Sequence, residues 1–153
     1  MNMDKPLNKT NIRLIAGVSG LTALLLLTAA AYFFWPVAFD AVSKAALYGL
    51  LLVSAAMLLM TSPRRLKPAA ALGVAAVCAA LLTLGVLLHN NLLHLLICRE
   101  LYGEVPTFGQ MLLADLRYPY GLRLWRYGGF AILSFAVCAW ALMRKEAAER
   151  DEC

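Results

Sequence analysis

Apolar and charged positions fall in long, separate blocks along this chain. Four predominantly apolar stretches predict helices over residues 14–37, 44–62, 69–98 and 122–143. At a rise of about 1.5 Å per residue, each helix can cross a hydrocarbon core about 30 Å thick. The pattern therefore predicts an all-α integral membrane protein, in which residues 1–153 form a single membrane domain built as a four-helix transmembrane bundle.

The connection between the third and fourth spans has a pattern of its own. Thr107 and Gln110 match a capping box, which would start a short helix over about residues 107–118, before Pro119. One face of this helix is apolar, so we expect it to lie flat on the outer membrane surface. That face is made by Phe108, Met111, Leu112 and Leu116.

Composition supports the membrane assignment and narrows the partners. The chain is 62% hydrophobic and 15% charged, too apolar for a small soluble domain to bury. Its net charge of +5 comes from Lys and Arg beside the apolar stretches rather than on one basic face, so we expect no nucleic acid partner. Cys78 and Cys138 lie within apolar stretches and predict no disulfide framework.

The positions of the basic residues predict the topology. Nine of the 14 Lys and Arg residues flank one set of span ends and five flank the other. The short basic turn from Arg64 to Lys67 is difficult to translocate, which places it and both termini in the cytoplasm. We expect the bacterial inner membrane. The short connections at 37–43 and 63–68 predict that the first three spans are sequential antiparallel neighbours.

The first span has an alternative interpretation as a signal peptide. Lys5, Lys9 and Arg13 precede an apolar run that reaches small residues at Ala29 to Ala31, as at a cleavage site. The run continues into the aromatic segment from Tyr32 to Trp35, which is typical of an interface anchor and favours an uncleaved span. Cleavage would leave three spans.

The third span carries two patterns on one helical face. Gly73, Ala76 and Ala80 form a small-residue face that predicts close helix packing. Towards the outer end the face becomes polar, whereas His89 points to the opposite side. With Asp115 of the loop, these residues make an outer polar cluster of Asn90, Asn91, His94, Cys98 and Asp115.

Two interpretations of the outer polar cluster remain open. His94 and Cys98, four residues apart, could supply two ligands of a metal ion, or they could be hydrogen-bonding partners at a helix interface. Two ligands without a third favour the interface interpretation. No cofactor is predicted.

Arginines alternate with aromatic residues where the fourth span begins. Arg123, Trp125 and Arg126 could anchor the chain in the outer headgroup region. They could instead bind an anion or a lipid headgroup, because the forked donors of Arg suit phosphate.

The segment from Glu100 to Pro106, which follows a long span, resembles the membrane bundle that precedes the catalytic domain of alkaline-phosphatase-like headgroup transferases. The chain has no room for that domain, so the resemblance implies at most a separate membrane module.

No catalytic residues are predicted, because no nucleophile has a base beside it and no phosphate loop is present. We therefore expect a non-catalytic accessory, assembly or immunity-type protein that binds lipids and either a membrane-protein partner or a second copy. The alternatives are a small oligomeric transporter or channel component, and the membrane module of a lipid-headgroup-handling or metal-handling enzyme.

The topology can be tested with reporter fusions. A reporter after Lys67 or Glu152 should behave as cytoplasmic, and one inserted near Glu104 should behave as external. External labelling of the turn from Arg64 to Lys67 in intact cells would show that the orientation is inverted.

Overall fold

Four helices form the structure, a computed structural model that describes residues 9–29, 41–61, 66–103, 107, 109–110, 113 and 122–148. The helices are α1 (Lys9–Thr28), α2 (Ala41–Met60), α3 (Pro68–Tyr102) and α5 (Leu122–Ala148). Each helix contains a segment of at least 18 residues that is long and apolar enough to cross a membrane. The predicted all-α class with four membrane-length helices is confirmed.

The helix ends lie close to the predicted ones, apart from the end of the first. α1 ends at Thr28 rather than at residue 37, and residues 30–40 lie outside the described part. The predicted interfacial helix also falls largely outside it. Its capping box is present, since the Thr107 N–H donates to Gln110 Oε1 (2.9 Å) and the Gln110 N–H donates to Thr107 Oγ1 (3.4 Å).

Local signals define both ends of α3. Pro68 occupies the first helical turn, where a backbone N–H has no acceptor within the helix, so the missing N–H of proline costs no hydrogen bond. At the other end Gly103 adopts a left-handed conformation (φ 67°), and its N–H donates to the carbonyl of Arg99 over 3.3 Å. Glycine tolerates this conformation without a steric cost, so it is a natural end for the helix.

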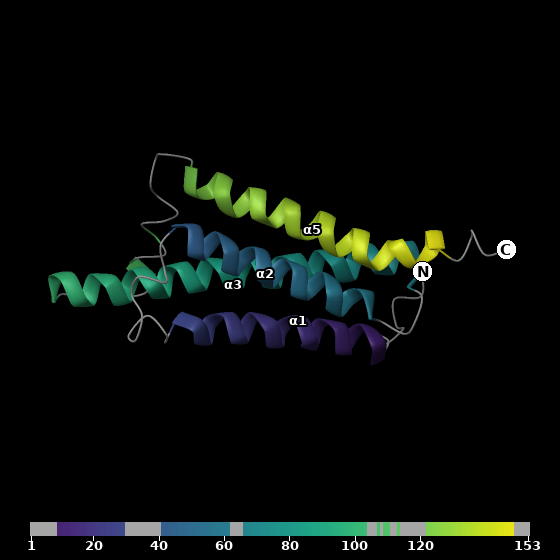
Figure 1. Ribbon diagram of the computed structural model, residues 1–153, viewed down its shortest axis with the longest axis horizontal. Coiled ribbons are helices and arrows are strands. Elements are labelled where there is room, and N and C mark those ends of the chain that lie inside the picture. Colours follow the sequence, from purple (N-terminus) through teal and green to yellow (C-terminus); the bar gives the residue numbers. More distant parts are fainter. Residues whose placement is uncertain are drawn as a thin grey trace.

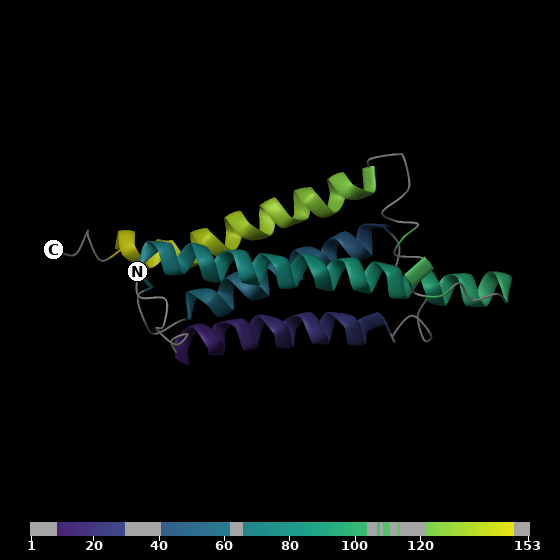
Figure 2. The same cartoon turned by 180° about the vertical axis from the view of Figure 1, so that it is seen from behind.

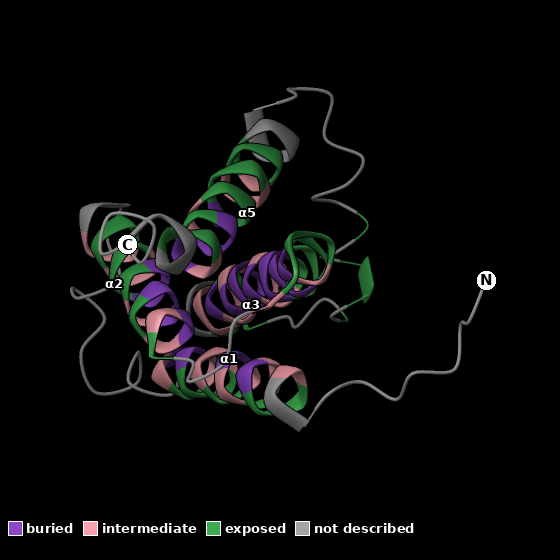
Figure 3. Ribbon diagram, turned by 90° about the vertical axis from the view of Figure 1, so that its right-hand side faces the viewer, coloured by how far each residue is buried: buried purple, intermediate pink, exposed green. Residues whose placement is uncertain are grey.

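The helices lie side by side along one bundle (Figure 1), and every helix contacts at least two others. α3 packs chiefly on α1 and α5, and α2 packs on the opposite sides of the same two helices. Viewed along the bundle, α2 and α3 therefore lie diagonally and touch little (Figure 3). The prediction that the first three spans are sequential neighbours is wrong for α2 and α3.

Small residues on α3 explain why α1 and α5 are its main neighbours. The inner face of α3 carries Ala71, Ala75, Cys78 and Ala79, which let the neighbouring helices approach closely. In an 18-residue apolar stretch of each helix, 44% of the residues of α3 are buried, against 22%, 28% and 22% for α1, α2 and α5. α3 is thus the helix on which the others assemble. The core also contains larger apolar side chains, among them Val18, Leu25, Leu52, Leu59, Leu82 and Val86.

The predicted packing face of α3 lies on an exposed side of the helix. Gly73, Ala76 and Ala80 are all exposed, and a methyl group added to Gly73 would meet nothing within 4 Å. The small residues that α3 uses inside the chain lie on its other side. Packing through Gly73, Ala76 and Ala80 therefore remains a prediction only for contacts outside the chain.

Two glycines instead mark the close contacts of α1. A methyl group at Gly85 of α3 would collide with Cγ2 of Thr22, and one at Gly17 of α1 would lie 2.6 Å from Cδ2 of Leu58 on α2. Thr22 is branched at Cβ and its hydroxyl donates to the carbonyl of Val18 (2.9 Å), so it has little freedom to move away.

The outward surface and the helix lengths fit an apolar solvent. Large apolar side chains such as Leu27, Leu50, Met57 and Ile132 are exposed. α3 extends beyond the other three helices at one end of the bundle, which we call the outer end (Figures 1 and 2). The opposite end, where α1 and α3 begin and α5 ends, is called the inner end.

The contact between α1 and α3 gives a stability prediction. Gly85→Ala should lower the melting temperature in detergent, because overpacking costs about 1–3 kcal/mol. Gly73→Ala, its matched control, should leave stability unchanged or raise it, since alanine favours a helix by up to about 1 kcal/mol over glycine. Equal melting temperatures for the two variants would contradict the assigned contact.

Candidate functional site

A buried histidine lies near the outer end of the bundle. His89 of α3 is completely buried (0% exposed) on the inward face of the helix. It shares this face with Leu82, Val86 and Leu93, which are also buried. A helical projection at 100° per residue places the same four positions on one face, but it does not tell which face of α3 is buried.

Hydrogen bonds join His89 to two other helices. Its Nε2 lies 3.1 Å from Oγ1 of Thr28 at the end of α1, and its Nδ1 lies 3.1 Å from the hydroxyl oxygen of Tyr48 on α2. The Thr28 hydroxyl donates its proton to the carbonyl of Leu25 (2.6 Å). Thr28 can therefore only accept from Nε2–H, which leaves Nδ1 of a neutral imidazole to accept from Tyr48.

The fourth helix takes part through ring contacts. The Tyr48 ring meets His89 edge to face with centroids 5.7 Å apart, and it meets Phe130 of α5 at 6.4 Å. We call Thr28, Tyr48, His89 and Phe130 the His89 cluster. It takes one residue from each helix, so it fixes the relative positions of all four at the outer end.

The arrangement of Thr28 and His89 is not that of a nucleophile activated by a base. A threonine beside a histidine resembles a nucleophile with its base, but here Nε2 carries a proton and the Thr28 hydroxyl already donates to Leu25. His89 has no exposed surface on which a substrate could bind. The cluster is better explained as a hydrogen-bonded connection between helices.

The predicted outer polar cluster is separated into different environments. Asn90 donates from Nδ2 to the Tyr127 hydroxyl (3.0 Å), a second connection between α3 and α5. Asn91 is completely buried, donates to the carbonyl of Leu87 (2.8 Å) and leaves Oδ1 without a partner. His94 is exposed and Cys98 is half-buried. Asp115 lies outside the described residues.

The two metal-ligand candidates gain no third ligand. Among the residues that the structure describes, no group of three or more His, Cys, Asp or Glu side chains could hold a metal ion. A metal at His94 and Cys98 therefore stays a hypothesis.

The anion-binding candidates lie in the first turns of α5. Arg123, Trp125 and Arg126 belong to the helix, and Arg126 is exposed at the outer end. The side chains of Arg123 and Trp125 lie outside the described part, so their use as an anchor or as a headgroup site stays a prediction.

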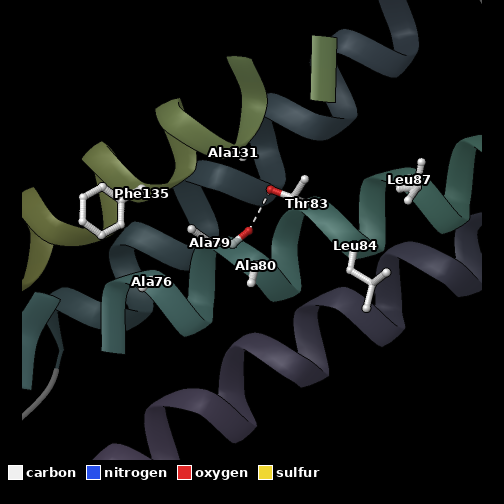
Figure 4. Close-up of a pocket in the computed structure, with 8 residues that line it drawn as sticks. All are labelled: Ala76, Ala79, Ala80, Thr83, Leu84, Leu87, Ala131 and Phe135. Carbon is white, nitrogen blue, oxygen red and sulfur yellow. Dashed lines mark hydrogen bonds between the residues drawn. The ribbon is translucent and has the colours of Figure 1, made fainter. Parts of the chain in front are cut away.

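An apolar groove runs along the outward side of α3 and α5 (Figure 4). Small residues, including the exposed Ala76 and Ala80, form much of its surface, with Phe135 of α5 on one side. The Thr83 hydroxyl is turned back to the carbonyl of Ala79 (2.8 Å), so even this residue has its polar group satisfied within α3. The full lining comprises Ala76, Ala79, Ala80, Thr83, Leu84, Leu87, Ala131 and Phe135.

Comparison with protein-family models, with curated proteins and with solved structures finds no match for this chain.

The His89 cluster predicts coupled losses of stability. Tyr48→Phe should destabilise the protein by about 0.5–1.5 kcal/mol in detergent, the value of one buried hydrogen bond. His89→Leu should cost more, because it removes both interhelical hydrogen bonds and takes away the imidazole partner of the Tyr48 hydroxyl. In the double variant the Tyr48 change should cost little further, since its partner is already gone.

His94→Leu is the control, because His94 is the other of the two histidines and is exposed. Strictly additive losses for Tyr48→Phe and His89→Leu in thermal unfolding would contradict the hydrogen bond.

Proposed function

We propose that this chain is a four-span membrane protein that acts without catalysis, by holding a transmembrane helix of another protein in the groove between α3 and α5. Both termini are cytoplasmic in this proposal, and the membrane is the bacterial inner membrane. The observation that carries the proposal is the groove, which presents small residues on a surface that is otherwise rich in large apolar side chains.

The composition of the groove favours a helix over lipid. Acyl chains are flexible and need no small residues beneath them, and large apolar side chains such as Leu24, Val53 and Ile132 are exposed outside the groove. Ala76 and Ala80 are one turn apart, and Gly73 continues the small surface towards the inner end. Helices in a bilayer associate through such close approach, because the hydrophobic effect gives them no reason to leave lipid.

The His89 cluster supports this role indirectly. Its hydrogen bonds hold α1 and α2 on the inward side of α3, which leaves the outward side of α3 open beside α5. The groove is therefore carried by helices that already satisfy one another, and a partner can bind without rearranging the core.

Site-specific photocrosslinking in cell membranes tests the proposal. A photoreactive amino acid at Leu84, an exposed residue of the groove, should yield one product with a different protein. The same amino acid at Val53, which is also exposed but lies on α2, should not. Filling the groove with Ala76→Leu and Ala80→Leu should remove the product and leave the melting temperature unchanged, because both positions are exposed.

Crosslinks from Leu84 to lipid alone would contradict the proposal. A product of twice the mass of the chain would place a second copy in the groove in place of another protein.

A further inference from the structure

The inner end of the bundle carries exposed cations on three of the four helices. Arg13 lies in the second turn of α1, Lys67 precedes α3, and Arg144 lies in the last two turns of α5; all three side chains are exposed. By sequence, nine Lys and Arg residues and five Asp and Glu residues belong to this side. The inner end therefore has a positive potential that attracts anions.

One of these cations is held in a defined place. The guanidinium carbon of Arg144 lies 5.0 Å from the ring centre of Trp140, one turn earlier on α5. The ring is 51% exposed on the outward surface of the helix. A guanidinium over an aromatic face is attracted by the ring electrons, so this arginine has a preferred position instead of sampling many.

The depth of this pair matches the membrane interface. The membrane-length segment of α5 ends at Arg144, and Trp140 lies about 6 Å further into it at 1.5 Å per residue. Exposed tryptophan rings favour the boundary between hydrocarbon and headgroups, where a neighbouring arginine reaches the phosphates. Attraction to the ring electrons does not require a classical hydrogen bond from the guanidinium, and the forked N–H donors of arginine suit phosphate oxygens.

We propose that Trp140 and Arg144 form a binding site for the phosphate of an anionic phospholipid. Arg144 donates to the phosphate oxygens, and the Trp140 ring packs against the first part of the lipid, from the side of α5 that faces the membrane. Lys67 and Arg13 at the same end add the positive potential that favours an anionic headgroup over a zwitterionic one. The site is separate from the groove, and it shares with the proposed function only the insertion of the four helices in a membrane.

Quenching of tryptophan fluorescence by brominated lipids tests the site. Trp35→Phe and Trp125→Phe leave Trp140 as the single tryptophan of the three. In vesicles of phosphatidylcholine with phosphatidylglycerol, brominated phosphatidylglycerol should be preferred at Trp140 by about fivefold, the effect of roughly one interfacial cation. Arg144→Gln should reduce this preference to nearly one, and Arg144→Lys should keep part of it by restoring the charge without the forked donors.

Arg99→Gln is the matched control, because it removes an exposed arginine from the other end of the bundle and should leave the preference unchanged. Helical content by circular dichroism confirms that each variant is folded. Equal quenching by the two lipids, or a preference that survives Arg144→Gln, would overturn the proposal. Loss of the preference on adding inorganic phosphate at constant ionic strength would show a site for free phosphate and would also overturn it.

Discussion

A buried imidazole has two ring nitrogens, and each must find a partner of the right kind. His89 meets this requirement with Tyr48 from one helix and Thr28 from another, so the positions of α1 and α2 along α3 follow from one side chain. In an apolar solvent no water is present to form a hydrogen bond with a polar group that lacks a protein partner. A shift of α1 or α2 by one turn would therefore leave a polar group of the cluster without its hydrogen bond. The register of the bundle therefore depends on this residue.

Small residues then decide which helices are neighbours. The alanines and Cys78 on the inner side of α3 bring α5 and α1 close, and Gly85 accommodates Thr22. Because lipid is as apolar as leucine, close packing rather than burial from water selects these contacts. The short connection between α2 and α3 does not override that selection, and the two helices lie diagonally.

The sequence predicts the number of long helices well, because uninterrupted apolar stretches of this length are typical of membrane-length helices. It does not predict which side of α3 faces inward, because this helix is apolar on every side and carries small residues on both faces. Gly73, Ala76 and Ala80 form one of these two small-residue faces, and they are exposed. Asn90, Asn91 and His94 give the sequence a polar face on one side of the helix, whereas the buried His89 lies on another side. To assign the buried face of such a helix, the positions of its neighbouring helices must be known, and the periodicity of the sequence does not give them.

The unequal lengths of the helices have a consequence for the surrounding lipid. The membrane-length segments of α1, α2 and α5 have 18, 18 and 19 residues, or about 27–29 Å, whereas that of α3 has 32 residues, or about 48 Å. α3 is packed between α1 and α5, so it cannot shorten its projection by tilting alone. Under the proposed membrane insertion, a bilayer around this bundle would meet two hydrophobic thicknesses at once, and it would have to thicken on the α3 side while staying ordinary on the α2 side.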